Sequence, residues 1–217
     1  MGGFRSDMTG TKAQGLADWA GRTGRAYLRF DYFAHGESSG DFLEATITGW
    51  RADALAVLDD LTRGEVVIVG SSMGGWIACL AAMARPDRVK ALVLLAPAPD
   101  FTEKLMRPQL PAEALAALER DGVWLQPSAY GDPNPIARAL LDDGDRWSIL
   151  PGPVNVTAPV RILQGGDDPD VPWRHALDLA QAIKSDDVVF SLIKDGDHRL
   201  SRPQDIDRLI TAVEEVV

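Results

Sequence analysis

Short runs of apolar residues recur along the chain between polar turns, which is the pattern of buried strands. Each run is rich in β-branched or aliphatic side chains and is bounded by Gly, Pro or Asp. Because both faces of such a run are apolar, the pattern predicts parallel strands that helices cover on both sides. The predicted strands are Ala26–Phe30, Val66–Val69, Ala91–Leu95, Val160–Gln164 and Val188–Ile193.

Between these runs, the apolar residues follow a helical spacing. The segment Gly74–Arg85 is small and apolar nearly all round, so we expect it to be buried against the sheet, and Pro86 ends it. The other predicted helices are Thr11–Arg22, Ile47–Leu61, Trp173–Ile183 and Pro203–Val216. Strands that alternate with helices predict an α/β fold with a mostly parallel sheet and helices on both of its faces.

One segment, residues 97–158, interrupts this alternation and is too long for a simple crossover connection. It contains a predicted helix, Ala112–Arg120, and the aromatic residues Trp124, Tyr130 and Trp147 among many Pro, Gly and Asp residues. We expect it to form a small helical lid over one end of the sheet, inserted into a single domain that spans residues 1–217. Its aromatic residues would either contact an apolar substrate or form the core of the lid.

The motif at Gly70–Gly74 (GSSMG) marks Ser72 as a candidate nucleophile. It directly follows the predicted strand Val66–Val69 and directly precedes the apolar helix. In that context, G-x-S-x-G holds a serine on a sharp turn above a sheet. The start of the helix adds free N–H groups, and the Met73 N–H could stabilise an oxyanion there. A glycine-rich turn can also simply begin a helix, whereas a phosphate-binding loop would require a lysine that is absent here.

A serine hydroxyl needs a base, and His198 is the best placed of the three histidines. His198 follows the last predicted strand, in a loop at the carboxyl end of the sheet, and comes after Ser72 in the chain. His35 belongs to an early loop, and His175 lies on a predicted helix where we expect it to face solvent. The sequence therefore predicts His198 as the general base.

An acid that orients this histidine should follow another strand between Ser72 and His198. The loop after Val160–Gln164 contains three carboxylates, at Asp167, Asp168 and Asp170. Acidic residues in a Gly- and Pro-rich loop are also common turn formers. Residue type alone therefore leaves the choice among the three open.

The composition narrows the classes of partner. The net charge of −10 disfavours binding to nucleic acid and to anionic membranes. No apolar run is long enough to span a bilayer, and no secretory signal is visible. The single cysteine, Cys79, excludes an intrachain disulfide and favours a cytoplasmic location. The histidines and the cysteine lack the spacing of metal ligands, so we expect neither a metal nor another cofactor.

Together, these motifs resemble those of the α/β-hydrolase superfamily over essentially the whole chain. In that family, a G-x-x-D-x-x-V-P loop often carries the acid, and Gly165–Pro172 (GGDDPDVP) matches it with Asp168 in the acidic position. The loop Asp31–Ser38 (DYFAHGES) is similar to the family's D-x-x-G-x-G-x-S turn, with Ala34 in place of the first glycine. The resemblance therefore implies an α/β-hydrolase fold and selects Asp168 from the three carboxylates.

Further segments resemble one branch of this superfamily, which includes the mitochondrial palmitoyl-protein thioesterase and acyl-glucuronide esterase and their bacterial relatives. These segments are Gly3–Lys12, Arg29–Tyr32 and Asp197–Leu200. The branch implies hydrolysis of acyl thioesters or esters without a cofactor. The resemblance also implies a second oxyanion donor after a glycine pair, which fits Phe4 after Gly2 and Gly3.

In the family, a strand leads into this glycine pair. It lies between the strands that we assign to Ala26–Phe30 and Val66–Val69. We therefore expect that N-terminal strands of the fold are missing ahead of Met1, through a late start codon or truncation.

These inferences predict a serine hydrolase that cleaves carboxylic esters or acyl thioesters through Ser72, His198 and Asp168 and an acyl-enzyme. Its substrate would be a small-molecule ester or thioester, or an acylated protein. One alternative is a non-catalytic scaffold with the hydrolase fold, and another is hydrolysis of amide or carbon–carbon bonds by the same triad. The sequence does not predict an oligomeric state.

Overall fold

A parallel sheet organises the molecule. The structure, a computed structural model, describes residues 1–127 and 133–217. The main sheet has four strands in the order β1-β2-β5-β6, and every neighbouring pair is parallel. Its strands are β1 (Val66–Ser71), β2 (Val89–Leu95), β5 (Val160–Gly165) and β6 (Val188–Ile193). These strands confirm four of the predicted runs and the α/β class.

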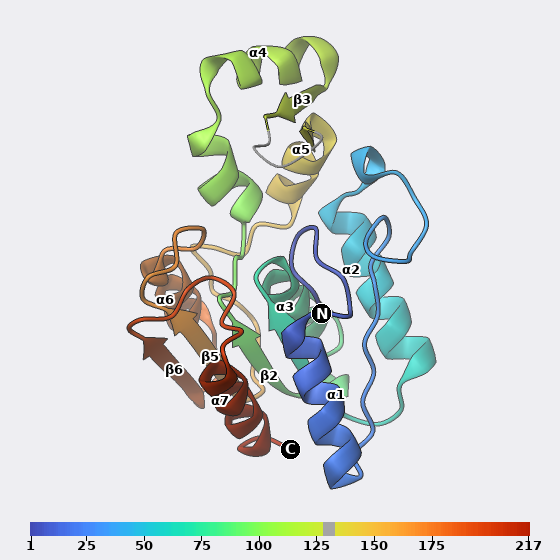
Figure 1. Cartoon of the computed structure of the whole chain (residues 1–217), viewed down its shortest axis with the longest axis vertical. Coiled ribbons are helices and arrows are strands. Elements are labelled where there is room, and N and C mark those ends of the chain that lie inside the picture. The colour runs from blue at the N-terminus through green and yellow to red at the C-terminus, as the bar shows by residue number, and fades with distance from the viewer. Residues whose placement is uncertain (128–132) are drawn as a thin grey trace.

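Helices cover both faces of this sheet (Figure 1). On β2, Leu92 and Leu94 face one helical layer, whereas Val93 and Leu95 face the other, as the two-residue period of a strand requires. The first layer contains α2 (Ile47–Ala56), α3 (Met73–Ala84) and α6 (Trp173–Ala182), and the second contains α1 (Thr11–Thr23) and α7 (Pro203–Glu214). Within the described ranges, no helix combines the length and the apolar character needed to cross a membrane.

The predicted strand Ala26–Phe30 is wrong, because this segment forms no ladder with any other part of the chain that the structure describes. A strand needs a neighbour to satisfy its N–H and C=O groups. Here a cleft of about 1240 Å³ lies along the outer edge of β1, and both Ala26–Phe30 and Val66–Val69 line it. Tyr27 and Leu28 are consequently 38% and 40% exposed. The apolar pattern identified an extended segment but not its lack of a partner.

The first residues of the chain lie at the carboxyl end of β1. The Met1 amino group donates to the Val69 carbonyl at 2.8 Å, and the Ser71 N–H donates to the Met1 carbonyl at 3.1 Å. These two bonds hold the segment that follows, which we call the glycine loop (residues 2–8), beside the turn after β1. The sheet therefore positions the beginning of the glycine loop directly.

Residues 97–158, here called the cap, connect β2 to β5, and the elements of this segment that Figure 1 labels lie together at one end of the molecule. The described part includes α4 (Ala112–Asp121), the antiparallel pair β3 (Val123–Gln126) and β4 (Asn134–Ala137), and α5 (Arg138–Arg146). Short helical turns, Thr102–Met106 and Arg107–Gln109, precede α4. That the cap acts as a lid stays a prediction.

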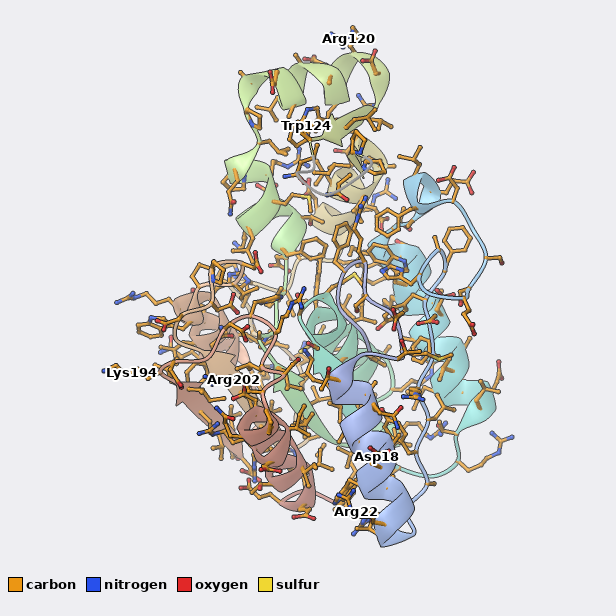
Figure 2. The ribbon with its side chains drawn as sticks, in the orientation of Figure 1. Asp18, Arg22, Arg120, Trp124, Lys194 and Arg202 are labelled. Atoms are coloured by element: carbon orange, nitrogen blue, oxygen red, sulfur yellow. The ribbon has the colours of Figure 1, made fainter. Side chains whose placement is uncertain are left out.

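Two tryptophans of the cap pack within the protein. Trp124 points into the interior of the cap, against the cluster of Leu118, Ile136 and Leu141 (Figure 2). The Trp147 indole N–H donates to the Thr48 hydroxyl on α2 at 2.7 Å. Tyr130 lies outside the described residues. Trp124 therefore packs in the core of the cap, whereas Trp147 joins the cap to α2.

Candidate active site

Ser72 lies on a tight turn between β1 and α3. Its φ is 55° and its ψ is −122°, a conformation that a residue with a side chain adopts only when its surroundings enforce it. Three backbone hydrogen bonds do so here. The Ser72 N–H donates to Leu95 at 2.9 Å, and the Ser72 carbonyl accepts from Gly75 at 2.8 Å and from Ala98 at 3.1 Å. The end of β2, the residues after it and the start of α3 thus all help to fix the turn.

Two glycines make this turn possible. A Cβ atom on Gly70 would lie 2.4 Å from the Gly74 carbonyl oxygen, inside the turn itself. A Cβ atom on Gly74 would lie 2.4 Å from the carbonyl oxygens of both Met1 and Gly2. Gly70 therefore allows the strand to meet the helix, and Gly74 leaves room for the glycine loop.

The structure brings Ser72, His198 and Asp168 together in one hydrogen-bonded chain. His198 Nε2 lies 3.1 Å from Ser72 Oγ, and His198 Nδ1 lies 2.8 Å from Asp168 Oδ2. Ser72 follows β1, Asp168 follows β5 and His198 follows β6, so all three come from the carboxyl ends of parallel strands. An ionised carboxylate only accepts, so Nδ1 carries the proton and Nε2 is free to accept from the serine.

The Asp168 carboxylate is buried and fully hydrogen-bonded. Its Oδ1 accepts from the N–H groups of Asp170 at 2.9 Å and Val171 at 2.8 Å, and its Oδ2 also accepts from Gln164 at 3.1 Å. Burial acts to raise the pKa of Asp168, but the hydrogen bonds from His198 and from these backbone groups outweigh it and lower the pKa. The carboxylate is therefore ionised near neutral pH.

Gln164, at the end of β5, is a part of this arrangement that the sequence did not reveal. Its side-chain amide donates to Asp168 Oδ2 and to the carbonyls of Gly165 and Val171, so it ties the acid to its own loop. The only sign of this role in the sequence was a polar residue near the end of an otherwise apolar strand.

The other two carboxylates of the loop, Asp167 and Asp170, are exposed. Asp170 lies near enough to Asp168 and His198 for one oxygen or nitrogen atom of each to fall within 4.8 Å. A metal would nevertheless have to displace the four hydrogen bonds that occupy the Asp168 oxygens. The geometry therefore fits an orienting acid at Asp168 better than a metal site.

The glycine loop borders both Ser72 and the first turn of α3. A Cβ atom on Gly3 would lie 3.2 Å from the Ser72 Cβ atom, so the two backbones are in close contact. Neither the Phe4 N–H, next along this loop, nor the Met73 N–H has an acceptor among the described residues. Two free donors thus lie in the residues that adjoin Ser72 on either side.

The remaining histidines lie away from the Ser72 hydroxyl, and both are buried. His175 was expected to face solvent, and that expectation is wrong: only 9% of it is exposed, and its Nε2 lies 2.7 Å from the Pro99 carbonyl. Burial lowers the pKa of His175, although the hydrogen bond to Pro99 opposes this. This side chain therefore faces Pro99, at the start of the cap, a tertiary contact that helical spacing does not reveal.

Comparison with known proteins places this geometry in context. Residues 4–209 match the model of a family described as the alpha/beta hydrolase family. Palmitoyl-protein thioesterase ABHD10, mitochondrial, from Bos taurus is 38% identical over 217 residues, which covers 99% of this chain and 71% of that protein. The Homo sapiens protein of the same name is 36% identical, with the same coverage.

Solved structures agree with these relatives. A structure from Agrobacterium vitis S4, described as a hydrolase, superposes with a TM-score of 0.94 and 47% identity, covering 100% of this chain and 85% of that one. Alpha/beta hydrolase domain-containing protein 10 from mouse gives a TM-score of 0.89 and 37% identity, covering 99% of this chain and 86% of that one.

Proposed function

The chain belongs to the alpha/beta hydrolase family, and from that membership and the geometry around Ser72 we propose that it is a serine hydrolase that cleaves acyl esters or thioesters. The observation that carries the proposal is the continuous chain from Ser72 Oγ through the His198 ring to the buried Asp168 carboxylate. Family membership supports hydrolysis in general, and the hydrogen bonds that join Ser72, His198 and Asp168 support a serine nucleophile in particular.

The mechanism follows from the protonation states. His198 Nε2 takes the proton of Ser72 while Oγ attacks the carbonyl carbon of the substrate, and Asp168 stabilises the imidazolium that forms. The tetrahedral intermediate then collapses, and His198 protonates the departing alcohol or thiol. An acyl group remains on Ser72, and a water molecule activated by the same histidine releases it as a carboxylic acid.

The Met73 and Phe4 N–H groups are the donors that we assign to the oxyanion. Met73 N–H is the first of helix α3, where the helix dipole adds positive charge. Phe4 N–H shares a peptide plane with the Gly3 carbonyl, which accepts from both the N–H and the hydroxyl of Ser6. That plane therefore points the Phe4 N–H away from Ser6. Donors fixed before the substrate arrives cost little reorganisation when charge develops.

The relatives named as thioesterases favour an acyl thioester as the substrate class. An aromatic cluster adjoins the proposed oxyanion donor: the Phe4 ring packs 5.5 Å from Phe101 and 5.2 Å from Phe42. An apolar wall beside the reacting carbonyl suits a hydrocarbon acyl group. A cytoplasmic location stays a prediction, since the curated relatives are named as mitochondrial.

The proposal is tested by rapid mixing of the full chain with p-nitrophenyl esters and with acyl-CoA thioesters of graded chain length. We expect a burst of p-nitrophenol equal to the enzyme concentration, followed by slower turnover, because the acyl-enzyme accumulates. The burst should vanish in Ser72→Ala and persist in Ser71→Ala, its neighbour in β1. An equal burst in Ser72→Ala would contradict the proposal, as would the absence of hydrolysis of every ester and thioester by the wild type.

A further inference from the structure

The Asp31–Ser38 loop holds the glycine loop at two points, although it contributes nothing to the triad. Asp31 Oδ1 accepts from the Met8 N–H at 2.7 Å. His35 Nε2 accepts from the Arg5 N–H at 3.1 Å, although the two residues are 30 positions apart. The second bond reaches the peptide immediately after Phe4, which is the proposed oxyanion donor.

This peptide lies in a turn that would not be stable by itself. The Ser6 N–H donates to the Gly3 carbonyl at 3.1 Å, so Phe4 and Arg5 are the two central residues of the turn. Arg5 has a φ of 57°, the conformation that type II turns require at this position and that glycine usually supplies. An arginine in this conformation persists only where surrounding contacts impose it.

His35 provides a contact that holds Arg5 in this conformation. Its Nδ1 lies 3.1 Å from the Phe33 carbonyl, which can only accept, so Nδ1 carries the ring proton. In the neutral ring, Nε2 then has a free lone pair, and the Arg5 N–H donates to it. The Phe33 carbonyl also accepts from the Trp50 indole at 3.1 Å, which fixes the group that orients the histidine. Loss of the lone pair would remove the acceptor that holds the Phe4–Arg5 peptide plane.

The surroundings keep this ring in place and uncharged. Only 4% of His35 is exposed, and its ring packs 5.1 Å from Trp50 and 5.4 Å from Phe42. The charged groups that face it are the carboxylates of Asp31 and Asp53 and the guanidinium of Arg5. Burial lowers the pKa of His35, against the opposing effects of the Phe33 carbonyl and the two carboxylates.

We infer that His35 is a positioning residue: its Nε2 accepts a hydrogen bond from the Arg5 N–H and thereby keeps the Phe4 N–H in its position relative to Ser72. The inference rests on the proposed function for its catalytic consequence. The hydrogen bond itself is independent of that function. His35 touches neither the substrate nor the reacting atoms, and it acts through the glycine loop alone.

The test compares His35→Gln with His35→Met in the full chain. The two side chains have nearly the same length and shape, but only glutamine offers an oxygen acceptor where Nε2 lies. We expect kcat of His35→Gln to stay within about threefold of the wild type. In His35→Met, we expect kcat to fall about tenfold to a hundredfold while KM changes less than about twofold, since the loss affects only the transition state. His175→Met is the matched control, a second buried histidine bonded to a carbonyl, and should retain its kcat.

Amide hydrogen exchange at Arg5, followed by NMR, separates this inference from the proposed function. Exchange should be slow in the wild type and in His35→Gln and should become fast in His35→Met, whether or not the chain hydrolyses esters. Equal exchange in the two variants would overturn the inference, as would equal kcat values in a chain that is active. An inactive wild type whose Arg5 exchange still depends on the acceptor would overturn the proposed function and leave the positioning contact established.

Discussion

The two sides of the candidate site are built in different ways. On the triad side, Ser72, Asp168 and His198 each follow a paired strand of the same sheet, and hydrogen bonds join them directly. On the glycine-loop side, Phe4 and Arg5 lie in an irregular segment, and the preceding residue, Met1, connects it to β1. The rest of that segment is held by the turn between Gly3 and Ser6 and by contacts with distant parts of the sequence.

The distant contacts come from two elements. Asp31 and His35 hold the glycine loop from the Asp31–Ser38 loop, and the Arg5 guanidinium donates to Asn134 and Pro135 of the cap strand β4. A sheet distributes the positioning of a residue over many ladder bonds, whereas this loop depends on a few single contacts. We therefore expect substitutions on the triad side to remove a reacting group and to cause large losses of kcat. Substitutions on the glycine-loop side should displace the oxyanion donor and cause smaller, more graded losses of kcat.

The largest effect is expected from Ser72→Ala. Removal of the hydroxyl leaves no nucleophile, so kcat/KM for a p-nitrophenyl ester should fall about 10⁶-fold. Steady-state hydrolysis with a purified variant measures this, and Ser71→Ala, which should keep its rate, is the control. A loss of less than about tenfold would show that another group attacks the substrate.

Asp168→Asn should reduce kcat about 10⁴-fold, because the amide can donate to Nδ1 and favours the tautomer in which Nε2 carries the proton. Thermal unfolding of the same sample checks that the loop remains folded. Asp170→Asn is the matched control in the same loop, and its carboxylate is exposed. If Asp170→Asn lost as much activity as Asp168→Asn, the assignment of the acid would be wrong.

Gly74→Ala changes a residue next to the Ser72 turn but should displace the glycine loop. Alanine favours a helix, but its Cβ atom would meet the Met1 and Gly2 carbonyl oxygens at 2.4 Å, and backbone atoms cannot easily yield. We expect kcat to fall about a hundredfold through displacement of the glycine loop. Gly21→Ala in helix α1, where a Cβ atom meets nothing within 4 Å, is the control and should be fully active. Unchanged kcat in Gly74→Ala would show that the glycine loop does not need its present position.

The smallest expected effect is a loss of folding stability in acid, to which the Asp168 carboxylate and the two buried histidines should respond differently. The pKa of Asp168 lies below its usual 3.8, so this carboxylate stays ionised in mild acid. The pKa values of His35 and His175 lie below 6.5, so the unfolded chain binds these protons first as the pH falls. The stability they confer is complete above 6.5 and is lost as the pH falls from there toward the folded pKa values.

Urea unfolding at about pH 7.5 and about pH 5.5 measures this loss, which cannot exceed about 1.4 kcal/mol per pH unit for each histidine. His35→Gln removes one of the two contributions, so its free energy of unfolding should depend less on pH than that of the wild type. An identical pH dependence in His35→Gln and the wild type would mean that His35 binds its proton equally well in both states.

The parts of the fold and the site that could be predicted from the sequence are those in which neighbouring residues in the sequence determine a residue's position. The turn at Ser72 was predicted because its strand, its glycines and its helix are adjacent in sequence. The choice of Asp168 needed a resemblance to known proteins, because three carboxylates share one loop. By contrast, Ala26–Phe30 has the composition of a strand but no partner strand among residues 1–127 and 133–217, and the composition of a segment cannot reveal whether a partner lies beside it.

The buried histidines and Gln164 were missed for a related reason. Each is a single polar residue, so no periodic pattern marks its burial, and each acts through a tertiary contact. His35 carried a weak signal, since it follows Asp31 in a glycine-containing turn. Nothing in that turn, however, indicates that the histidine accepts from Arg5. Local chemistry was thus predictable on the triad side, whereas the supports of the glycine loop required the structure.

Labelling with a fluorophosphonate probe shows whether Ser72 is an activated nucleophile. The probe reacts covalently with serines that a neighbouring base activates. Peptide mapping by mass spectrometry after labelling of the full chain should place the adduct on Ser72, with no adduct in Ser72→Ala and an undiminished one in Ser71→Ala. An unlabelled wild type, or an adduct on any other residue that persists in Ser72→Ala, would contradict the account.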